Sequence, residues 1–304
     1  MFQTQRGRGI RYGAILVCAL GIHFVALVHS LPPVASDGLM AEHSLDLSPR
    51  QTIPGPLAMF PSGPLNQFLR ILSSLPKGAI ALDDAGKILT PLQQRLADSV
   101  GINTDKDDLV QNSPCADVTV VFARGTTEPG NMGLVTGPPF IDALGKQLGN
   151  KSLAVQGVEY PATFAGFNKN GTDGVPSMTS FINDVISNCP NTKVVMPGYS
   201  QGALVLRSTA DTLPATTMSK INSVVTFGDP RNPAPITGAS GKSLVICQAD
   251  DSVCKGGFIN VAHLTYGANA TMAAQFVIQN ANGEWEYSRL QNANIYKSNT
   301  LLLV

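Results

Sequence analysis

The chain has 304 residues, enough for one large domain or two modest ones. Its 21 lysines and arginines balance 21 aspartates and glutamates, and charged residues make up only 14% of the chain. The sequence contains no basic stripe and no long acidic tail, which argues against a nucleic-acid-binding face. We therefore expect no nucleic-acid partner.

The first 30 residues have the layout of a secretory signal peptide. Arg6, Arg8 and Arg11 precede an apolar run over residues 14–28, and small or apolar residues then offer a cleavage site. The run is shorter than the ~20 residues needed to span a bilayer, which disfavours an uncleaved anchor. We expect a secreted, extracellular protein with no stable membrane insertion after the leader is removed.

Cysteine usage agrees with secretion. Cys18 lies in the predicted leader and leaves with it. The rest of the chain keeps an even number of cysteines, Cys115, Cys189, Cys247 and Cys254. Two disulfides are expected in a secreted chain, and the spacing alone does not choose among the three possible pairings.

Residues 31–112 are Pro-rich and broken, and we interpret them as an N-terminal extension or propeptide. Two short amphipathic helices are predicted within this segment. The first opens after Ser62, and its apolar face consists of Leu65, Phe68, Leu69 and Leu72. The second begins with Thr90 as N-cap and Pro91 at the first helical position, and Gln93 completes a capping box.

Apolar strands alternate with amphipathic helices over residues 113–280. The predicted strands cover 118–122, 153–158, a segment beginning at Val194, 224–227 and 244–247. Helices with apolar stripes lie between them, and the last is expected near 272–278. This alternation predicts an α/β fold with a parallel sheet covered by helices on both faces. Residues 281–304 form a polar C-terminal tail.

The sequence Gly198-Tyr199-Ser200-Gln201-Gly202 follows an apolar strand and opens a helix. This is the context of a nucleophile elbow, a sharp turn that lifts one serine out of the sheet. The two glycines remove side chains where the strand and helix backbones approach each other. The Ser200 hydroxyl then points into the crevice at the carboxyl ends of the strands. Ser200 is the predicted nucleophile.

A serine hydroxyl needs a neighbouring base, and in this topology the acid and then the histidine follow the nucleophile along the chain. His263 is the only histidine after Ser200 and is the predicted base. The candidate acids between them are Asp211, Asp229, Asp250 and Asp251. The last two follow a strand inside a small loop flanked by cysteines, where a disulfide would hold a carboxylate still. The alternative is that this disulfide only stabilises the fold and that the aspartate is solvated.

An oxyanion hole needs two donors aimed at the developing negative charge. The backbone N–H of Gln201, directly after the nucleophile, is one candidate. Thr126, in the loop after the first strand, could donate through its N–H and its hydroxyl, unless it is merely a turn residue. The sequence has no His/Cys cluster with metal-ligand spacing, so we expect no metal and no organic cofactor.

Four motifs together resemble the secreted fungal cutinases. They are the loop over residues 122–131, the elbow over 198–202, the loop from Cys247 to Cys254, and the run over 263–267. The resemblance implies that Ser200, Asp251 and His263 form a catalytic triad. It further implies Thr126 and Gln201 as oxyanion donors, and the disulfides Cys115–Cys189 and Cys247–Cys254.

The resemblance also implies a small α/β-hydrolase, a three-layer sandwich with a five-stranded parallel sheet. The active site would be open, without a full lid, and flanked by two apolar loops. The residues expected to contact substrate there are Tyr160, Phe164, Phe258, Ile259 and Val261. The segment before Cys115 is longer than the family's usual extension, and the polar tail is extra.

These expectations describe a monomeric, secreted serine esterase that hydrolyses cutin, related aliphatic polyesters or small esters. Acetylxylan esterase activity is the nearest alternative, since the same fold supports it. A different class of protein, a secreted surface-binding protein on a hydrolase scaffold, is the second alternative, because fold alone does not imply activity.

Overall fold

The computed structural model describes residues 53–75, 79–111, 113–282 and 301–302. The predicted leader, residues 1–30, and most of the predicted C-terminal tail lie outside these residues. No helix within the described ranges is long and apolar enough to cross a membrane.

One sheet organises the described chain. Its strand order is β2-β1-β3-β4-β5-β6, with the first five strands parallel and β6 antiparallel to β5. The strands are β1 (Val118–Phe122), β2 (Leu153–Gly157), β3 (Lys193–Tyr199), β4 (Ile221–Phe227), β5 (Ser243–Ile246) and β6 (Leu301–Leu302). Every residue of β1 and β5 is buried, as expected for parallel strands covered on both faces.

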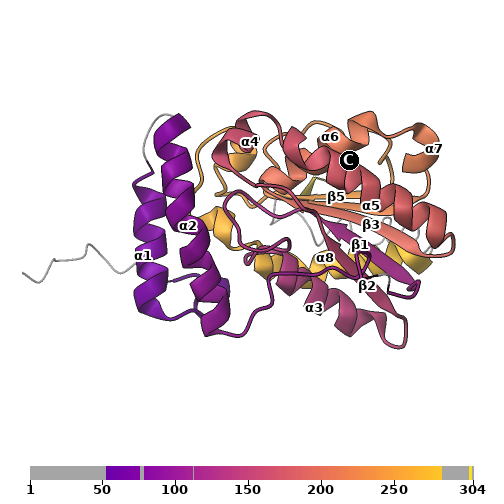
Figure 1. Ribbon diagram of the computed structural model, residues 1–304, viewed down its shortest axis with the longest axis horizontal. Helices are drawn as coiled ribbons and strands as arrows, with labels where there is room; N and C mark the ends of the chain where they lie inside the picture. Colours follow the sequence, from indigo (N-terminus) through magenta and orange to yellow (C-terminus); the bar gives the residue numbers. More distant parts are fainter. Residues whose placement is uncertain (1–52, 76–78, 112, 283–300, 303–304) are drawn as a thin grey trace, which may run out of the picture. The chain divides into compact units, whose positions relative to one another are not determined.

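Helices cover both faces of the sheet (Figure 1). Helices α5 (Val175–Asn188) and α6 (Gln201–Thr212) pack on one face, and α3 (Gly137–Leu148) and α8 (Ala270–Asn282) pack on the other. Side chains alternate between the two cores along β1: Val121 joins the α5–α6 side, and Val120 and Phe122 join the α3–α8 side. This alternation follows from the two-residue period of a strand. The predicted three-layer α/β-hydrolase fold is confirmed.

A third apolar cluster joins helices α1 (Ser62–Ser73) and α2 (Ala79–Ser99) to loops near the ends of the strands (Figure 1). Its fully buried members include Leu65 of α1, Leu89 and Leu96 of α2, and Leu264 beyond the sheet. Two short helices, α4 (Phe164–Asn168) and α7 (Ala215–Met218), complete the set.

The predicted start of the second N-terminal helix was wrong. The helix begins at Ala79 rather than after Thr90, and Pro91 lies inside it. Proline removes one backbone donor within a helix. The apolar stripe of Leu89, Leu92 and Leu96 is buried along both sides of that position, so packing outweighs the lost hydrogen bond.

The sharp turn between β3 and α6 depends on two glycines. A Cβ on Gly198 would lie 2.4 Å from the Gly202 carbonyl oxygen, and a Cβ on Gly202 would lie 1.9 Å from the Ala123 carbonyl oxygen. Both obstacles are backbone atoms, which cannot rotate away. The predicted requirement for small residues therefore has a direct steric cause.

We expect Gly202→Ala to lower the free energy of unfolding by at least about 3 kcal/mol, because it forces helix α6 away from β1. Gly145→Ala, in helix α3, is the matched control, since a Cβ at this position would meet no atom closer than 3.9 Å. That variant should gain up to about 1 kcal/mol from helix propensity. Thermal and denaturant unfolding measure both, and equal stability of the two variants would contradict the steric argument.

Candidate active site

Ser200 lies at the tip of the turn in a strained conformation. Its φ is 55° and its ψ is −116°, a region that residues with a Cβ rarely adopt. The Ser200 N–H donates to the Phe227 carbonyl at 2.9 Å, which fixes the turn to β4. Strained residues persist where their surroundings over-determine them, and they concentrate at functional sites.

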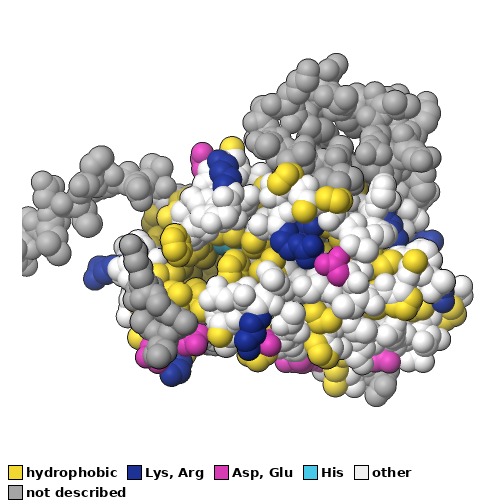
Figure 2. All heavy atoms as spheres, turned by 90° about the horizontal axis from the view of Figure 1, so that it is seen from above, with side chains coloured by type: hydrophobic (Ala, Val, Ile, Leu, Met, Phe, Trp, Pro, Cys, Tyr) yellow, Lys and Arg dark blue, Asp and Glu magenta, His cyan; other side chains and the backbone are white. Residues whose placement is uncertain are grey.

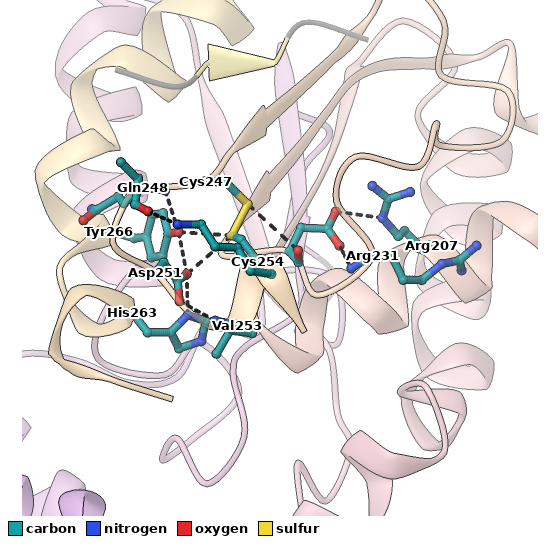
Figure 3. The surroundings of a disulfide bond; sticks show 12 residues. Arg207, Arg231, Cys247, Gln248, Asp251, Val253, Cys254, His263 and Tyr266 are labelled. Atoms are coloured by element: carbon teal, nitrogen blue, oxygen red, sulfur yellow. Dashed lines mark hydrogen bonds and ion pairs between the residues drawn. A yellow bond between two sulfur atoms is a disulfide. The ribbon is translucent and has the colours of Figure 1, made fainter. Parts of the chain in front are cut away.

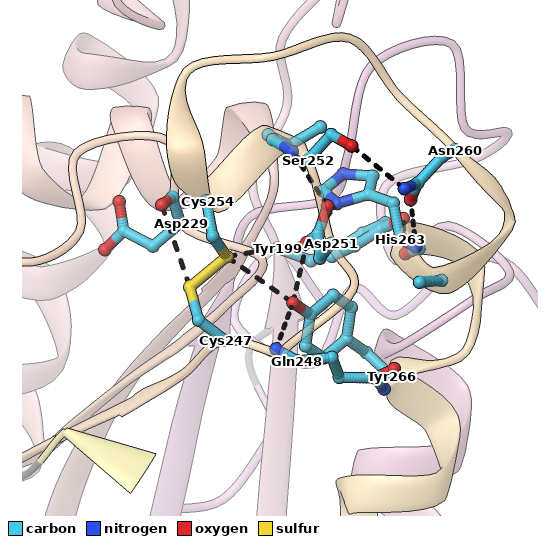
Figure 4. A network of polar contacts seen from close by, with 12 residues as sticks. Tyr199, Asp229, Cys247, Gln248, Asp251, Ser252, Cys254, Asn260, His263 and Tyr266 are labelled. Carbon is cyan, nitrogen blue, oxygen red and sulfur yellow. Dashed lines mark hydrogen bonds and ion pairs between the residues drawn. A yellow bond between two sulfur atoms is a disulfide. The ribbon is translucent and has the colours of Figure 1, made fainter. Parts of the chain in front are cut away.

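His263 and Asp251 form a buried pair (Figure 4). His263 Nδ1 lies 2.8 Å from Asp251 Oδ2, and both side chains are fully buried. The Tyr266 hydroxyl donates to the same carboxylate oxygen at 2.7 Å, and the Tyr199 hydroxyl donates to the His263 carbonyl at 2.7 Å. His263 Nε2 has no hydrogen-bond partner among the described residues. The imidazole is therefore held through one nitrogen, and the other is left for a reacting group.

Asp251 remains a carboxylate despite its burial. Burial alone would raise its pKa, but hydrogen bonds and charge from His263, with donors from Tyr266 and the Val253 N–H, outweigh burial. The net effect holds the pKa of Asp251 below its ordinary value of 3.8. Asp251 therefore stays ionised at neutral pH, as an acid that orients a histidine must.

The two disulfides are Cys115–Cys189 and Cys247–Cys254. The second closes a loop of seven positions around Asp251 (Figure 3). Inside this loop the Val253 N–H donates to Asp251 Oδ1 at 2.9 Å. The carboxylate is thus fixed by its own loop as well as by His263.

The other candidate acids have different surroundings. Asp229 forms a fully buried ion pair with Arg207 at 2.7 Å, and its side chain lies away from His263 (Figure 4). Asp211 pairs with Arg231 and Thr237 at the surface, and Asp250 is exposed. Of the four candidate acids, only Asp251 forms a hydrogen bond with the imidazole. Its loop lies shortly before the turn that carries His263.

Thr126 lies in a loop held from within by a buried carboxylate. Glu128 Oε2 accepts the Gly125 N–H at 2.7 Å, and Oε1 accepts the N–H groups of Leu134 and Val135 at 2.9 and 2.8 Å. Burial raises the pKa of Glu128, and these donors together with the nearby Arg124 oppose that rise. Neither the Thr126 N–H nor its hydroxyl has a hydrogen-bond partner among the described residues, so both remain free to donate.

Gln201 supplies the first residue of helix α6. The first N–H groups of a helix have no partner within the helix, so the Gln201 N–H is oriented outward beside the nucleophile. The partial positive charge of the helix N-terminus also favours a negative charge there. The Gln201 side-chain amide is fully buried and has no hydrogen-bond partner among the described residues, a feature that the sequence did not predict.

A cavity of about 340 Å³ contains Thr126, Ser200 and His263 in its lining. Figure 2 shows a hollow with hydrophobic side chains on its walls. Its apolar lining includes Leu72, Leu82, Phe164, Phe167, Phe258 and Ile259. Leu72 and Leu82 come from α1 and α2, so these helices add a third wall to the two loops that the sequence predicted.

Two of the five predicted substrate contacts lie elsewhere. Tyr160 is only 7% exposed: its ring lies beneath the Arg124 guanidinium, and its hydroxyl donates to the Arg124 carbonyl. Its interpretation as an exposed aromatic was wrong, because the adjacent Arg124 draws it inward. Val261 packs against the α1–α2 cluster and does not line the cavity.

The residues that could bind a metal do not gather in the described parts of the chain. Residues 53–75, 79–111, 113–282 and 301–302 contain no group of three or more His, Cys, Asp or Glu side chains suited to an ion.

A parallel sheet, a strained serine between β3 and α6, and a buried histidine–carboxylate pair define an α/β-hydrolase. A cutinase family model matches residues 114–281. The chain belongs to the cutinase family and is a carboxylic ester hydrolase.

Its relatives and a solved structure agree. A cutinase of Botryotinia fuckeliana is 47% identical over 55% of this chain and 85% of its own length. A cutinase of Hypocrea jecorina is 40% identical over 70% of this chain and 85% of its own. The structure of a Trichoderma reesei cutinase in complex with a C11Y4 phosphonate inhibitor has a TM-score of 0.63 at 40% identity, and covers 71% of this chain and 98% of its own.

The Hypocrea jecorina match reaches into the N-terminal helices. It covers 70% of the chain, more than the segment matched by the family model, and few residues follow position 281. The additional aligned residues must therefore come in part from the segment before position 114. The match therefore extends into the segment that holds helices α1 and α2.

We expect Glu128→Gln to lower kcat about tenfold, because an amide NH₂ cannot accept the Gly125 N–H and the loop carrying Thr126 shifts. The unfolding free energy should fall by less than about 2 kcal/mol, since losing the charge removes its desolvation. Ester kinetics and thermal unfolding measure the two effects. Glu159→Gln is the control, because Glu159 is exposed and the amide oxygen of the variant can still accept a hydrogen bond from Asn131. An unchanged kcat in Glu128→Gln would contradict the expectation.

Removing each disulfide in turn should affect the free energy of unfolding and kcat to different extents. On the chain-entropy relation, replacing Cys247 and Cys254 by alanine lowers stability by about 2.5 kcal/mol, and replacing Cys115 and Cys189 by about 4.5 kcal/mol. Only the first pair frees the Asp251 loop, so we expect its kcat to fall about tenfold or more while the second pair keeps its kcat. Denaturant unfolding and ester kinetics on both double variants test this, and a larger kcat loss in the second pair would refute it.

Proposed function

We propose that this carboxylic ester hydrolase is a secreted serine esterase that cleaves cutin or related aliphatic polyesters. Ser200, His263 and Asp251 act as its triad, and Thr126 and Gln201 form its oxyanion hole. The proposal depends on how the imidazole is held: Nδ1 is bound to a buried carboxylate, and Nε2 has no partner among the described residues. His263 and Ser200 also line the same cavity.

Acylation begins when Ser200 Oγ attacks the ester carbonyl carbon. His263 Nε2 takes the hydroxyl proton as the bond forms, and Asp251 stabilises the resulting imidazolium. The carbonyl oxygen becomes an oxyanion that accepts hydrogen bonds from Thr126 and from the Gln201 N–H. Collapse of this intermediate expels the alcohol, which receives the proton from His263, and leaves an acyl group on Ser200.

Deacylation repeats these steps with water. His263 takes a proton from water, whose oxygen attacks the acyl carbon, and the same two donors stabilise the second oxyanion. Collapse returns the proton to Ser200 Oγ and releases the carboxylic acid. His263 accepts and returns the proton in both halves of this scheme.

The cavity supports an aliphatic substrate. Its volume of about 340 Å³ and its apolar lining suit an acyl chain longer than acetate. The relatives named above are cutinases, and we extend that substrate class to this chain. Phe164, Phe258 and Ile259 are the proposed substrate contacts among the residues lining the cavity.

Secretion is part of the proposal. The two disulfides fit an oxidising compartment, and the predicted leader over residues 1–30 would direct the chain there. We propose that the enzyme acts as a monomer. We also propose that the segment over residues 31–112 is more than a removable propeptide, because it contributes helices α1 and α2 to the cavity wall.

Hydrolysis of p-nitrophenyl esters from acetate to palmitate tests the proposal. We expect wild-type turnover to peak at butyrate or longer, and Ser200→Ala to lower kcat at least about a thousandfold. Ser219→Ala, at an exposed serine, is the control and should keep full activity. Activity confined to acetate would favour an acetylesterase such as an acetylxylan esterase, and no Ser200-dependent turnover would favour a binding protein.

A further inference from the structure

Helix α2 reaches the loop after β1 with two polar side chains. Thr90 Oγ1 donates to the Thr127 carbonyl oxygen at 2.8 Å. Gln93 Nε2 lies 3.0 Å from the same oxygen and 3.1 Å from Thr127 Oγ1, so its two hydrogens can serve both. Gln93 is only 3% exposed, so its amide is committed to this contact. Both donors therefore converge on one residue.

That residue is strained and directly follows Thr126. Thr127 has a φ of 61°, in the left-handed region that β-branched residues avoid. Its N–H donates to the Ala162 carbonyl at 2.7 Å, and its carbonyl is bound by α2. The peptide groups on both sides of Thr127 are thus fixed, one by the loop after β2 and the other by the helix.

The remaining anchors of the loop lie further along. The Arg124 Nε donates to the Glu128 carbonyl at 2.8 Å, and the Glu128 carboxylate accepts the Gly125 N–H. Together with α2, these contacts hold residues on either side of Thr126 and leave its own donors free. This is the arrangement an oxyanion hole requires, since donors must be oriented before charge develops.

Ordinary helix packing does not account for these contacts. The apolar stripe of α2, including Leu89, Leu92 and Leu96, already buries the helix. Apolar side chains at positions 90 and 93 would pack as well, but they would leave the Thr127 carbonyl buried without a donor. The helix also passes beside Thr127 one turn earlier, since a Cβ on Gly86 would stand 3.4 Å from Thr127 Cγ2.

We propose that Thr90 and Gln93 are positioning residues that hold the Thr126–Thr127 segment in its catalytic conformation. Helix α2 is then a working part of the esterase site as well as a wall of the cavity. This inference rests on the proposed function, because it assigns Thr126 to the oxyanion hole. Since the oxyanion exists only after attack, loss of these contacts should lower kcat and leave KM nearly unchanged.

Steady-state hydrolysis of p-nitrophenyl butyrate by Gln93→Met, Thr90→Val and the double variant tests the inference. We expect kcat to fall about tenfold in Gln93→Met, about threefold in Thr90→Val and further in the double variant, with KM within about twofold. Thr90→Ser keeps the hydroxyl and should restore wild-type kcat. Gln94→Met is the matched control, because Gln94 lies on the same helix and bonds to Asp98 and Thr104 instead.

A second readout reports on the tetrahedral centre directly. The rate constant for inactivation by an alkyl phosphonate ester, which reacts with Ser200, should fall in parallel with kcat in the two variants. Circular dichroism and thermal unfolding verify that each variant is folded.

Three results would overturn the inference. They are an unchanged kcat in a folded Gln93→Met/Thr90→Val double variant, an equal kcat loss in Gln94→Met, or a rise in KM alone. If the wild type shows no Ser200-dependent turnover, the proposed function fails and the inference fails with it; turnover lost in Ser200→Ala but intact in the α2 variants rejects the inference alone.

Discussion

The close contact between β3, β1 and the start of α6 is the constraint on which the rest of the site depends. It forces Ser200 into a conformation with positive φ and places it at the carboxyl ends of the strands. Gly228 provides clearance for His263, since a Cβ there would stand 2.6 Å from the His263 ring. Ser200 and His263 therefore reach their positions because side chains are absent beneath them.

Two buried carboxylates near the ends of the strands have different tasks because their neighbours differ. Asp229 is neutralised by the Arg207 guanidinium and ties α6 to the end of β4. Asp251 has no permanent cation beside it; it accepts from an imidazole, a phenol and a backbone N–H. A permanent ion pair at Asp251 would compete with His263 for the carboxylate.

The substrate cavity is assembled from segments that are distant in the chain. Helices α1 and α2, the α4 region and the loop after the Cys247–Cys254 disulfide each contribute apolar side chains to it. The residues of the proposed triad come from the elbow, from the disulfide loop and from the turn beyond that loop. The proposed triad and most of the cavity wall therefore come from different parts of the fold, while α2 both lines the cavity and binds the loop that carries Thr126.

The sequence by itself determined the elements whose signals are local. Apolar runs indicated the buried strands, and two glycines around Ser200 indicated the elbow. His263 was identified because it is the only histidine after Ser200. The residues alone did not choose between Asp250 and Asp251 as the partner of His263, and the resemblance to cutinases favoured Asp251. The direction of Tyr160 required the tertiary structure, because it depends on which neighbour is near in space. The α2 contacts show this most clearly: Thr90 and Gln93 match a helix N-cap pattern locally, yet their hydrogen bonds go to a residue 37 and 34 positions away. Periodicity and capping rules describe neighbours along the chain, and only the folded chain decides which distant carbonyl a buried donor will meet.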